Sequence, residues 1–354
     1  MDAMLLRIGY VRRALTVFSA LVLTPACTPS PSPSLIKLSG PTMGTQYLVQ
    51  LPSLPPGENP ERLRAEVEHE LAAVNAAMST YIDDSEISRF GSHRENDWFG
   101  VSPTTAKVVR EALRIGELTG GAFDITVAPI VDRWGFGSDR RRDGIPSPQE
   151  ISALLTHTGF NKVAVRETPP ALRKKTAKLR VDLSGIAKGY AVDAIAELLE
   201  SKGIHDYWVD IGGDLRVAGR RGKRAWRSGI EKPTEGGGRA VLKIIELSDR
   251  AMATSGDYRN FFVRDGRRFS HTIDPRTGSP VTHKLTSVSV IAPTCMEADA
   301  LATAFLVLGP DDGYNLASKL GVPAYFIVRT TDEVRTSDFR TLTTPALHAF
   351  LQAQ

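Results

Sequence analysis

The chain has 354 residues, of which 42% are hydrophobic and 24% are charged, and its formal net charge is +4. This composition is that of an ordinary globular protein, and the length permits one large domain or two closely packed halves. The charge is small and the basic residues are scattered, apart from Arg140, Arg141 and Arg142. The composition therefore gives no indication of nucleic-acid binding.

The first 26 residues have the pattern of an export signal. Three arginines precede an apolar run at 14–23, which is too short to span a bilayer but has signal-peptide proportions. Cys27 follows a small residue, as in the lipobox of bacterial lipoproteins, although the match to that motif is imperfect. We predict a signal peptide at 1–26, lipidation of Cys27 and a Pro/Ser tether at 27–39, with ordinary secretion as the alternative.

Helices are predicted where capping residues precede an apolar periodicity. The first begins at Asn59-Pro60, and one of its faces is apolar: Leu63, Val67, Leu71, Val74 and Met78. Two more begin at Ser102-Pro103 and Ser147-Pro148, where proline suits the first helical position. A further helix follows the glycine turn at 185–189 and ends at Gly203.

Strands are predicted between these helices. The stretch 35–51 has a strand pattern broken by GPTMGT, and 179–183 alternates apolar and polar residues. Other strands are predicted at 207–211, 215–218, 240–247 and 285–292, with terminal elements at 323–328 and from 341 onward. The interleaved order and the short turns predict an α+β fold with mostly antiparallel sheets and no linker between domains after residue 40.

The segment 294–309, TCMEADALATAFLVLG, is predicted to be a helix. Thr294 and Glu297 have the spacing of a capping box. Asp299 and Thr303 lie four residues apart, so their oxygens share one helix face. A carboxylate and a hydroxyl suit a hard cation such as Mg²⁺. The alternative is that Asp299 only favours the positive helix start and Thr303 only packs.

Other polar segments interrupt the pattern, and each has a structural alternative. In 40–45, Met43 between glycines could contact a flat ring or form a tight turn. The segment 121–126 could hold a planar heterocycle or simply supply a core Phe and a turn Asp. The segment 182–190 places free N–H groups and a lysine at a helix start, which favours an anion. The Gly-Gly turn at 210–214 is best interpreted as a hairpin.

His271 is the best candidate for acid–base chemistry, because it lies between a serine and an Asp-Pro turn. Lone histidines are more often satisfied surface or core residues, so this candidate depends on its surroundings. Cys295 is the one other cysteine besides Cys27. It is predicted to be a buried, inert thiol, and no intramolecular disulfide is expected if Cys27 is lipidated.

In order along the chain, the motifs GPTMGT, MSTY, SEISRF, GAFDITVAP, WGFG, DLSGIAKGYAVD, IGGDLRVAG, ATSGDYRNFF, SHTIDPRTG and ADALATAFLVLG closely resemble the FAD:protein FMN transferase family, known as ApbE. The resemblance runs from about Gly40 to at least Gly309. It implies one T-fold-like catalytic domain at 40–354, with two lobes and FAD between them. It also implies Mg²⁺-dependent transfer of FMN from FAD to a threonine hydroxyl of a partner protein, with release of AMP.

The resemblance further implies roles for individual residues. Mg²⁺ would be held by Asp299, Thr303 and the backbone carbonyl of Ala187, with Mn²⁺ as another possible ion. His271 would prepare the attacking hydroxyl, with assistance from Asp257. The implied contacts with FAD are Met43, Tyr81, Ala122, Phe123, Asp124, Ser184, Lys188 and Ile273.

The acceptors implied by the resemblance are flavin-carrying subunits of Na⁺-translocating NADH:quinone oxidoreductase and Rnf-type complexes, and FMN-binding domains of exported reductases. The predicted location is the periplasmic face of the inner membrane, with attachment through the lipid on Cys27 alone. Two other functions remain open. One is an FAD pyrophosphatase, which uses water as acceptor, and the other is a flavin-binding lipoprotein without turnover.

Overall fold

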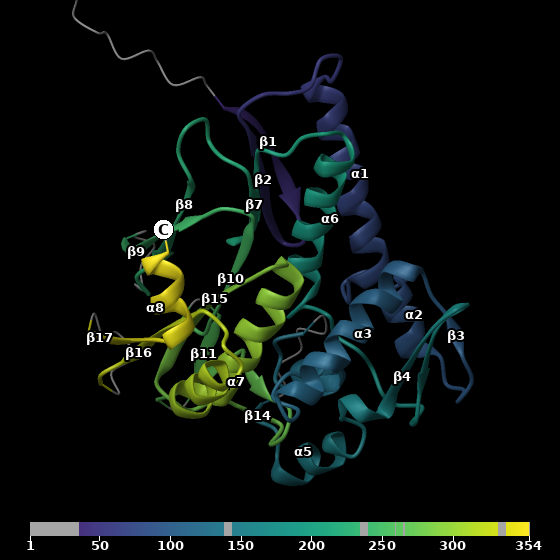
Figure 1. Ribbon diagram of the computed structural model, residues 1–354. Helices are drawn as coiled ribbons and strands as arrows, with labels where there is room; N and C mark the ends of the chain where they lie inside the picture. The colour runs from purple at the N-terminus through teal and green to yellow at the C-terminus, as the bar shows by residue number, and fades with distance from the viewer. Residues whose placement is uncertain are drawn as a thin grey trace, which may run out of the picture. The chain divides into compact units, whose positions relative to one another are not determined.

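The computed structural model describes residues 35–137, 144–233, 240–258, 260–264, 266–331 and 338–353 (Figure 1). Leu35–Gln354 form a compact unit by themselves. The predicted signal peptide, Cys27 and the arginines at 140–142 lie outside the described residues. The predicted tether at 27–39 was too long, because residues 36–39 are paired in a β-strand. The clustered hydrophobic cores lie within this unit, so we expect it to fold without the residues that precede it. No helix in the described ranges has both the length and the apolar character needed to cross a bilayer.

Among the described residues, eight strands form an antiparallel sheet in the order β1-β2-β6-β7-β10-β15-β16-β17. This confirms the predicted α+β fold with mostly antiparallel pairing. The strands are β1 (Ile36–Thr42), β2 (Thr45–Leu51), β6 (Tyr207–Ile211), β7 (Asp214–Ala218), β10 (Arg250–Gly256), β15 (Leu285–Ala292), β16 (Ala324–Arg329) and β17 (Phe339–Thr343).

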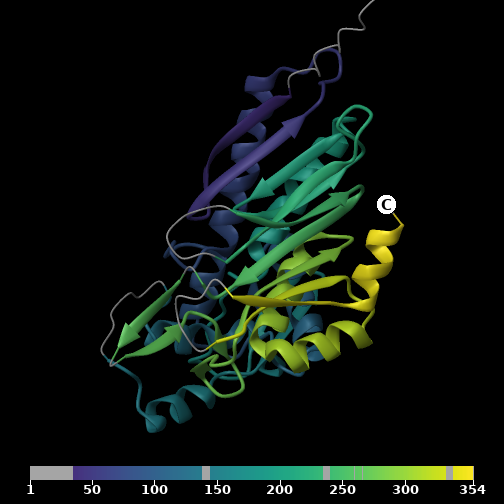
Figure 2. The same ribbon diagram turned by 90° about the vertical axis from the view of Figure 1, so that its left-hand side faces the viewer.

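Helices cover one face of this sheet, and a hairpin and the last helix cover the other (Figure 2). The first group is α1 (Pro60–Met78), α6 (Ala187–Ser201) and α7 (Cys295–Lys319). The second is the hairpin of β8 (Trp226–Glu231) and β9 (Val241–Leu247) with α8 (Pro345–Gln352). A core that joins β7, β8, β9 and α8 fills the space on that second face.

A further group of elements surrounds α3 and the loops that lead into α6. Its helices are α2 (Glu86–Ser92), α3 (Pro103–Leu118), α4 (Ala128–Arg133) and α5 (Pro148–Leu155), with short 3-10 turns at Ile125–Val127 and Phe160–Lys162. Its small sheet has the order β3-β5-β4, formed by Phe99–Gly100, Pro170–Lys174 and Val163–Glu167. Two hairpins follow β10: β11 (Phe261–Arg264) with β12 (Arg267–Ser270), and β13 (Ile273–Asp274) with β14 (Ser279–Pro280).

The predicted helix starts at 60, 103 and 148 are confirmed, each with its expected cap. The Asn59 side chain accepts hydrogen bonds from two backbone N–H groups of the first turn, at 2.8 and 3.2 Å. Ser102 accepts one from Thr105 N at 3.1 Å. Ser147 and Glu150 form a reciprocal capping box. Side-chain caps of this kind satisfy backbone donors that a helix leaves unpaired at its start.

One strand prediction was wrong, and one predicted break between strands is confirmed. The segment 179–183 forms no strand, although its alternation correctly places Leu179, Val181 and Leu183 in the core. Alternating residues indicate that one face of a segment is buried, but a β-strand also needs a hydrogen-bonded partner strand. Among the described residues, no strand pairs with this segment. The break predicted in 35–51 is confirmed: GPTMGT contains the β1–β2 turn, which is limited to Met43 at φ 47° and Gly44 at φ 72°. Such positive angles are typical of a two-residue hairpin.

The predicted end of the late helix at Gly309 is confirmed as a kink. Gly309 has φ 86° and ψ −175°, and Pro310 starts a second helical segment that runs to Lys319. At the other end, Thr294 caps the helix by accepting a hydrogen bond from Glu297 N at 3.3 Å. The Glu297 carboxylate pairs with Arg114 at 2.8 Å.

A buried lysine connects β5 of the small sheet to α2. Lys174 is 1% exposed, and its ammonium donates to the carbonyls of Phe90, Gly91 and Leu179 at 2.8–3.1 Å. Burial lowers the pKa of this lysine to about 8, because removal from water disfavours the charged form. The sequence pattern gave no sign of this residue's burial.

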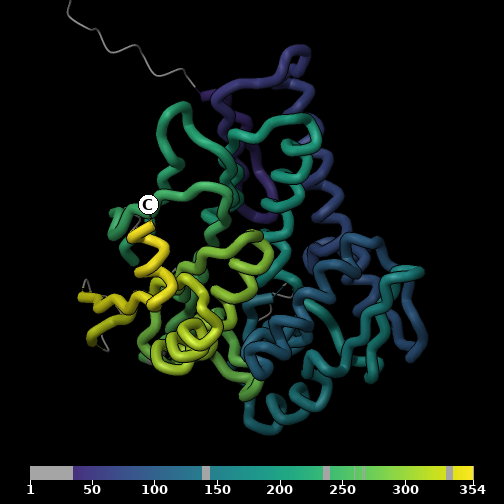
Figure 3. Tube along the Cα trace, in the orientation of Figure 1, coloured from purple at the N-terminus to yellow at the C-terminus, as the bar shows by residue number. Residues whose placement is uncertain are grey.

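The starts of α6 and α7 are interlocked by two aspartates, and the two helices lie side by side (Figure 3). Asp193 of α6 accepts hydrogen bonds from Cys295 N at 2.9 Å and Met296 N at 2.8 Å, in the first turn of α7. Asp299 of α7 accepts one from Gly189 N at 3.0 Å, in the first turn of α6. Each helix therefore supplies the carboxylate that satisfies backbone donors of the other.

Gly189→Ala should disrupt this contact. A Cβ at position 189 would lie 2.3 Å from the Cys295 carbonyl oxygen and 2.8 Å from Asp299 Cβ, so the helices must move apart. We expect a loss of about 1–3 kcal/mol in the free energy of unfolding, measured by urea denaturation. The control is Gly100→Ala, where a Cβ meets no atom within 4 Å and the expected change is about 0.5 kcal/mol or less. Equal effects of the two substitutions would contradict the interlock.

Candidate functional site

Segments far apart in the sequence meet around one cavity of about 590 Å³. Its lining includes five residues that the sequence singled out: Met43, Tyr81, Ser184, Ala187 and Lys188. They come from the β1–β2 turn, the loop after α1 and the start of α6. A cavity of this size, formed where several elements end, is typical of a small-molecule site.

Local geometry explains why these residues reach the cavity. Met43 stands at the tip of the hairpin, and Asn75 of α1 donates to the neighbouring Thr42 hydroxyl at 3.4 Å. Tyr81 follows the end of α1 and remains 60% exposed, so its ring is free to cover a ligand at the mouth. The wall formed by Ser184, Ala187 and Lys188 consists of the turn that leads into α6 and the first two residues of that helix.

Charged groups are concentrated where this turn meets β7. The Lys188 ammonium contacts the Asp214 carboxylate, whose second oxygen accepts a hydrogen bond from Thr254 N at 3.2 Å. Burial disfavours the lysine's charge, but attraction by Asp214 and Asp299 outweighs burial and raises the pKa of Lys188. The lysine is therefore held as a cation at the cavity wall.

Asp299 is 4% exposed and lies on the first turns of α7. Burial raises its pKa to about 7; attraction by Lys188 opposes this shift and repulsion by Asp214 adds to it. Two buried carboxylates thus share one ammonium, and the negative charge between them is not fully compensated. An additional cation at this position would be electrostatically favourable.

Thr303 and the 184–188 turn adjoin each other. A Cβ on Gly185 would lie 3.4 Å from Thr303 Oγ1 and 3.1 Å from Phe123 Cε2, so the turn packs directly on α7 and on the Phe123 ring. The Thr303 hydroxyl is 3.0 Å from Ser255 Oγ of β10, and either group can be the donor. Asp299, Thr303 and the turn that carries Ala187 are therefore brought together by the fold.

No three side chains of the His, Cys, Asp and Glu types gather as a metal cluster within the described ranges. The predicted ion site has a different composition, with one carboxylate, one hydroxyl and one backbone carbonyl. Oxygen donors of mixed kind suit Mg²⁺, which keeps several water or phosphate ligands instead of an all-protein cage. The roles of these three residues as ligands remain predictions.

His271 follows β12, and its ring has a defined orientation. Nδ1 lies 2.9 Å from the Asn260 backbone oxygen, and the Phe136 ring lies edge-on at 6.3 Å between centroids. Because a carbonyl can only accept, the neutral ring must carry its proton on Nδ1, which leaves Nε2 as the acceptor. Burial lowers the pKa of His271, while the Asn260 carbonyl and the charge of Asp257 oppose that shift.

Asp257 is 2% exposed and is engaged by arginines. Arg268 Nη1 donates to its carboxylate at 2.7 Å, and Arg329 Nη2 lies 3.7 Å away. The hydrogen-bond partner of the His271 ring is thus the Asn260 carbonyl and not Asp257. Assistance by Asp257 stays a prediction, and the structure limits it to an electrostatic effect.

The remaining predicted FAD contacts do not line this cavity. The Asp124 carboxylate accepts three hydrogen bonds, from Thr126 N at 2.8 Å, Thr126 Oγ1 at 2.6 Å and Phe160 N at 2.8 Å, so it stabilises its own turn. Ile273 packs in a core with aromatic residues. Ala122 and Phe123 are buried, and Phe123 approaches the site through Gly185. Contact of all four with FAD remains a prediction.

Sequence reasoning missed the supporting acids of the site. Asp193 closes the motif DLSGIAKGYAVD and Asp214 closes the turn IGGD, but neither was given a role. A signal was available for Asp193, because an acid within a buried helical face needs a partner that satisfies it. Its partners, the first N–H groups of α7, are about 100 residues away and could not be inferred from spacing.

Comparison with known proteins supports one family throughout. A family model described as the ApbE family matches residues 43–326. A relative from Vibrio cholerae serotype O1, named FAD:protein FMN transferase, is 42% identical over 334 residues, which cover 93% of this chain and 98% of the relative. A relative of the same name from Haemophilus influenzae is 43% identical over 303 residues, which cover 84% of this chain and 87% of the relative.

A solved structure is similar over nearly the same extent. The flavin transferase ApbE from Vibrio cholerae matches with a TM-score of 0.81 and 41% identity, covering 89% of this chain and 99% of that one. The sequence motifs, the fold and the matched extent agree, and the chain belongs to the ApbE family.

Proposed function

We propose that the protein is an FAD:protein FMN transferase, the activity for which its relatives are named. The observation that carries this proposal is the cavity lined by Met43, Tyr81, Ser184, Ala187 and Lys188, beside the interlocked starts of α6 and α7. The apolar and aromatic groups suit an isoalloxazine or adenine ring, and the charged end suits the diphosphate.

The diphosphate end of FAD would lie against the positive ends of two helices. The dipoles of helix N-termini attract anions, and the Lys188 ammonium adds a full charge. Backbone N–H groups in the first turns of the two helices already donate to carboxylates of the protein, so the dipoles and the ammonium are what would attract the phosphates. Asp299, Thr303 and the Ala187 carbonyl would hold Mg²⁺. Burial, with repulsion by Asp214, raises the pKa of Asp299, and a bound cation would favour its charged form. Bound there, Mg²⁺ would neutralise phosphate oxygens and stabilise the leaving phosphate.

The reaction would replace the phosphoanhydride bond of FAD with a phosphoester bond to the acceptor. An acceptor hydroxyl, a threonine by family resemblance, attacks the FMN phosphorus, the bond to the bridging oxygen breaks, and AMP leaves with that oxygen. His271 Nε2 would take the hydroxyl proton, because a neutral hydroxyl is a weak nucleophile without a base. The Asn260 carbonyl keeps the ring in the tautomer that can accept it.

We further propose the cellular setting that the sequence predicts. The protein would be exported, lipidated at Cys27 and held on the periplasmic face of the inner membrane. Its acceptors would be flavin-carrying subunits of Na⁺-translocating NADH:quinone oxidoreductase or Rnf-type complexes, or FMN-binding domains of exported reductases. Mass spectrometry of the mature N-terminus tests lipidation, since an unmodified Cys27 would contradict it.

One assay separates the proposed activity from its two rivals. Protein, FAD, Mg²⁺ and a reductase fragment with a candidate threonine are incubated and then denatured. Covalent flavin fluorescence on the fragment is the expected result. FMN and AMP without labelling would indicate a pyrophosphatase, and intact FAD would indicate a binding protein. Either of these last two outcomes contradicts the proposal.

His271→Ala should abolish transfer and leave FAD binding largely intact. Removal of a general base typically lowers the rate about 10²–10⁴-fold, whereas the ring is outside the cavity lining. Single-turnover labelling measures transfer, and flavin fluorescence titration measures binding. The control is His69→Ala, an exposed residue of α1 that should keep full activity. Loss of binding with unchanged turnover would refute the assignment.

Asp299→Asn should weaken the response to Mg²⁺ at least about tenfold, because a ligand loses its charge. An amide oxygen at this position can still accept the hydrogen bond from Gly189 N, so the interlock should persist. The thermal unfolding midpoint is measured against Mg²⁺ concentration, with and without FAD. Asp311→Asn, an exposed residue of the same helix, is the matched control. Full activity and an unchanged Mg²⁺ response in Asp299→Asn would exclude this metal site.

A further inference from the structure

The connection between β7 and β8 is strongly basic. Residues 219–225, here called the basic loop, contain four cations: Arg220, Arg221, Lys223 and Arg224. All four side chains are exposed, and Arg227 follows on β8. Within the described ranges, no carboxylate side chain forms an ion pair with Arg221, Lys223 or Arg224. These three charges are therefore directed to solvent or to a partner that the structure does not include.

The basic loop has a defined backbone. Asp249 accepts a hydrogen bond from Gly219 N at 3.0 Å, and Asp206 accepts one from Arg220 N at 2.6 Å. Arg221 and Arg224 exchange backbone hydrogen bonds at 2.9 and 3.3 Å across the tip. Two nearby carboxylates thus hold the backbone of the loop, and its basic side chains extend from a fixed turn.

The strand register fixes where the loop lies. Ile36 pairs with Leu51, the neighbouring Gln50 pairs with Trp208, and Tyr207 pairs with Ala218, the residue before the basic loop. The loop and the point where the chain enters β1 are therefore at the same end of the sheet. Three strand spacings separate them, which is about 14 Å. Figure 1 shows the β7–β8 connection and the start of β1 at the upper end of the sheet.

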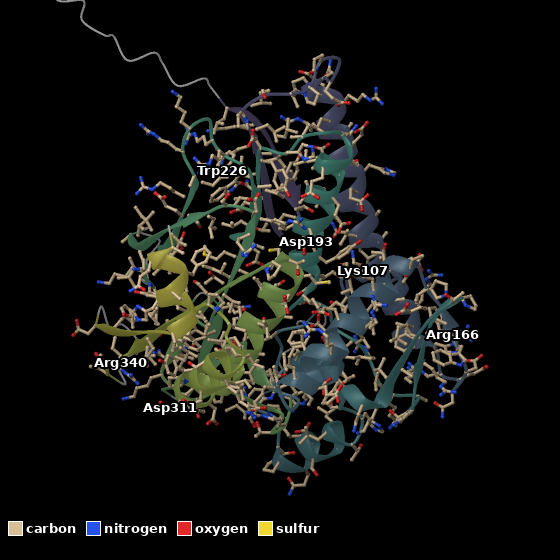
Figure 4. All side chains as sticks on the ribbon, viewed as in Figure 1. Lys107, Arg166, Asp193, Trp226, Asp311 and Arg340 are labelled. Atoms are coloured by element: carbon tan, nitrogen blue, oxygen red, sulfur yellow. The ribbon has the colours of Figure 1, made fainter. Side chains whose placement is uncertain are left out.

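The cavity is at the opposite end of the same strands. Met43 and Gly44 form the β1–β2 turn, which is about 20 Å from Ile36 along β1. Asp214 starts β7 at that end, and the basic loop follows the last residue of β7 at the other. The sheet thus separates a basic end from the end that carries the site. Figure 4 shows nitrogen-tipped side chains around the labelled Trp226, which follows the loop.

We propose that the basic loop binds the surface of an anionic phospholipid membrane and orients the protein with its cavity away from the bilayer. The proposal rests on the proposed lipidation of Cys27. The eight residues 27–34 can span at most about 28 Å, so β1 would begin close to the membrane if Cys27 carries the lipid. Tethering keeps the loop at high local concentration near the headgroups, and each basic side chain there adds to binding.

Vesicle binding tests the proposal without the lipid anchor. The chain from Leu35 onward, which contains the described elements and cores, is mixed with vesicles of phosphatidylcholine alone or with about one third phosphatidylglycerol, and bound protein is measured by sedimentation. The variant carries Arg221→Gln, Lys223→Gln and Arg224→Gln. A matched control carries Arg173→Gln, Lys175→Gln and Lys178→Gln, which removes three exposed cations of the β5 region.

We expect the protein to bind anionic vesicles but not neutral ones, and we expect salt to weaken this binding. Binding should be at least about tenfold weaker in the loop variant and little changed in the control variant. Absence of binding, equal binding to neutral vesicles, or equal losses in both variants would overturn the proposal. Flavin transfer to a soluble acceptor is measured in parallel and should be equal in all three proteins. Failure of transfer with intact vesicle binding would count against the proposed activity and leave the membrane surface standing.

Discussion

Two helix starts that hold each other in place are the constraint on which the site depends. Asp193 accepts the first backbone N–H groups of α7, and Asp299 accepts that of Gly189 in α6. The close approach requires glycine at 189, because any side chain would meet the Cys295 carbonyl. Residues about 100 positions apart thereby form one rigid corner, which fixes Asp299 and the 184–188 turn relative to each other.

The same contact creates the electrostatic character of the site. The dipoles of two helix N-termini and the Lys188 ammonium are positive at this corner, which favours an anion such as a diphosphate. Asp214 and Asp299 are buried there as well and share that one ammonium, which favours a cation. A ligand that brings phosphates together with Mg²⁺ satisfies both tendencies. We infer that a dinucleotide and a hard cation would bind together at this corner.

Local patterns predicted much of this structure, and long-range contacts account for what they missed. The cap at Asn59 and the shared face of Asp299 and Thr303 depend on residues a few positions apart, so spacing alone identifies them. The segment 179–183 alternates as a strand does, but strand formation needs a partner that alternation cannot supply. The burial of Lys174 and the capping role of Asp193 depend on backbone groups of distant segments. No sequence spacing reports such contacts.

The central claim is that the corner between α6 and α7 forms a cation site shared with the flavin diphosphate. The most direct test is a crystal structure with FAD and Mn²⁺, which replaces Mg²⁺ and can be located by its anomalous scattering. The account predicts one peak between the Asp299 carboxylate, the Thr303 hydroxyl and the Ala187 carbonyl, with the flavin in the cavity beside Met43. A peak elsewhere, or FAD bound away from this corner, would contradict it.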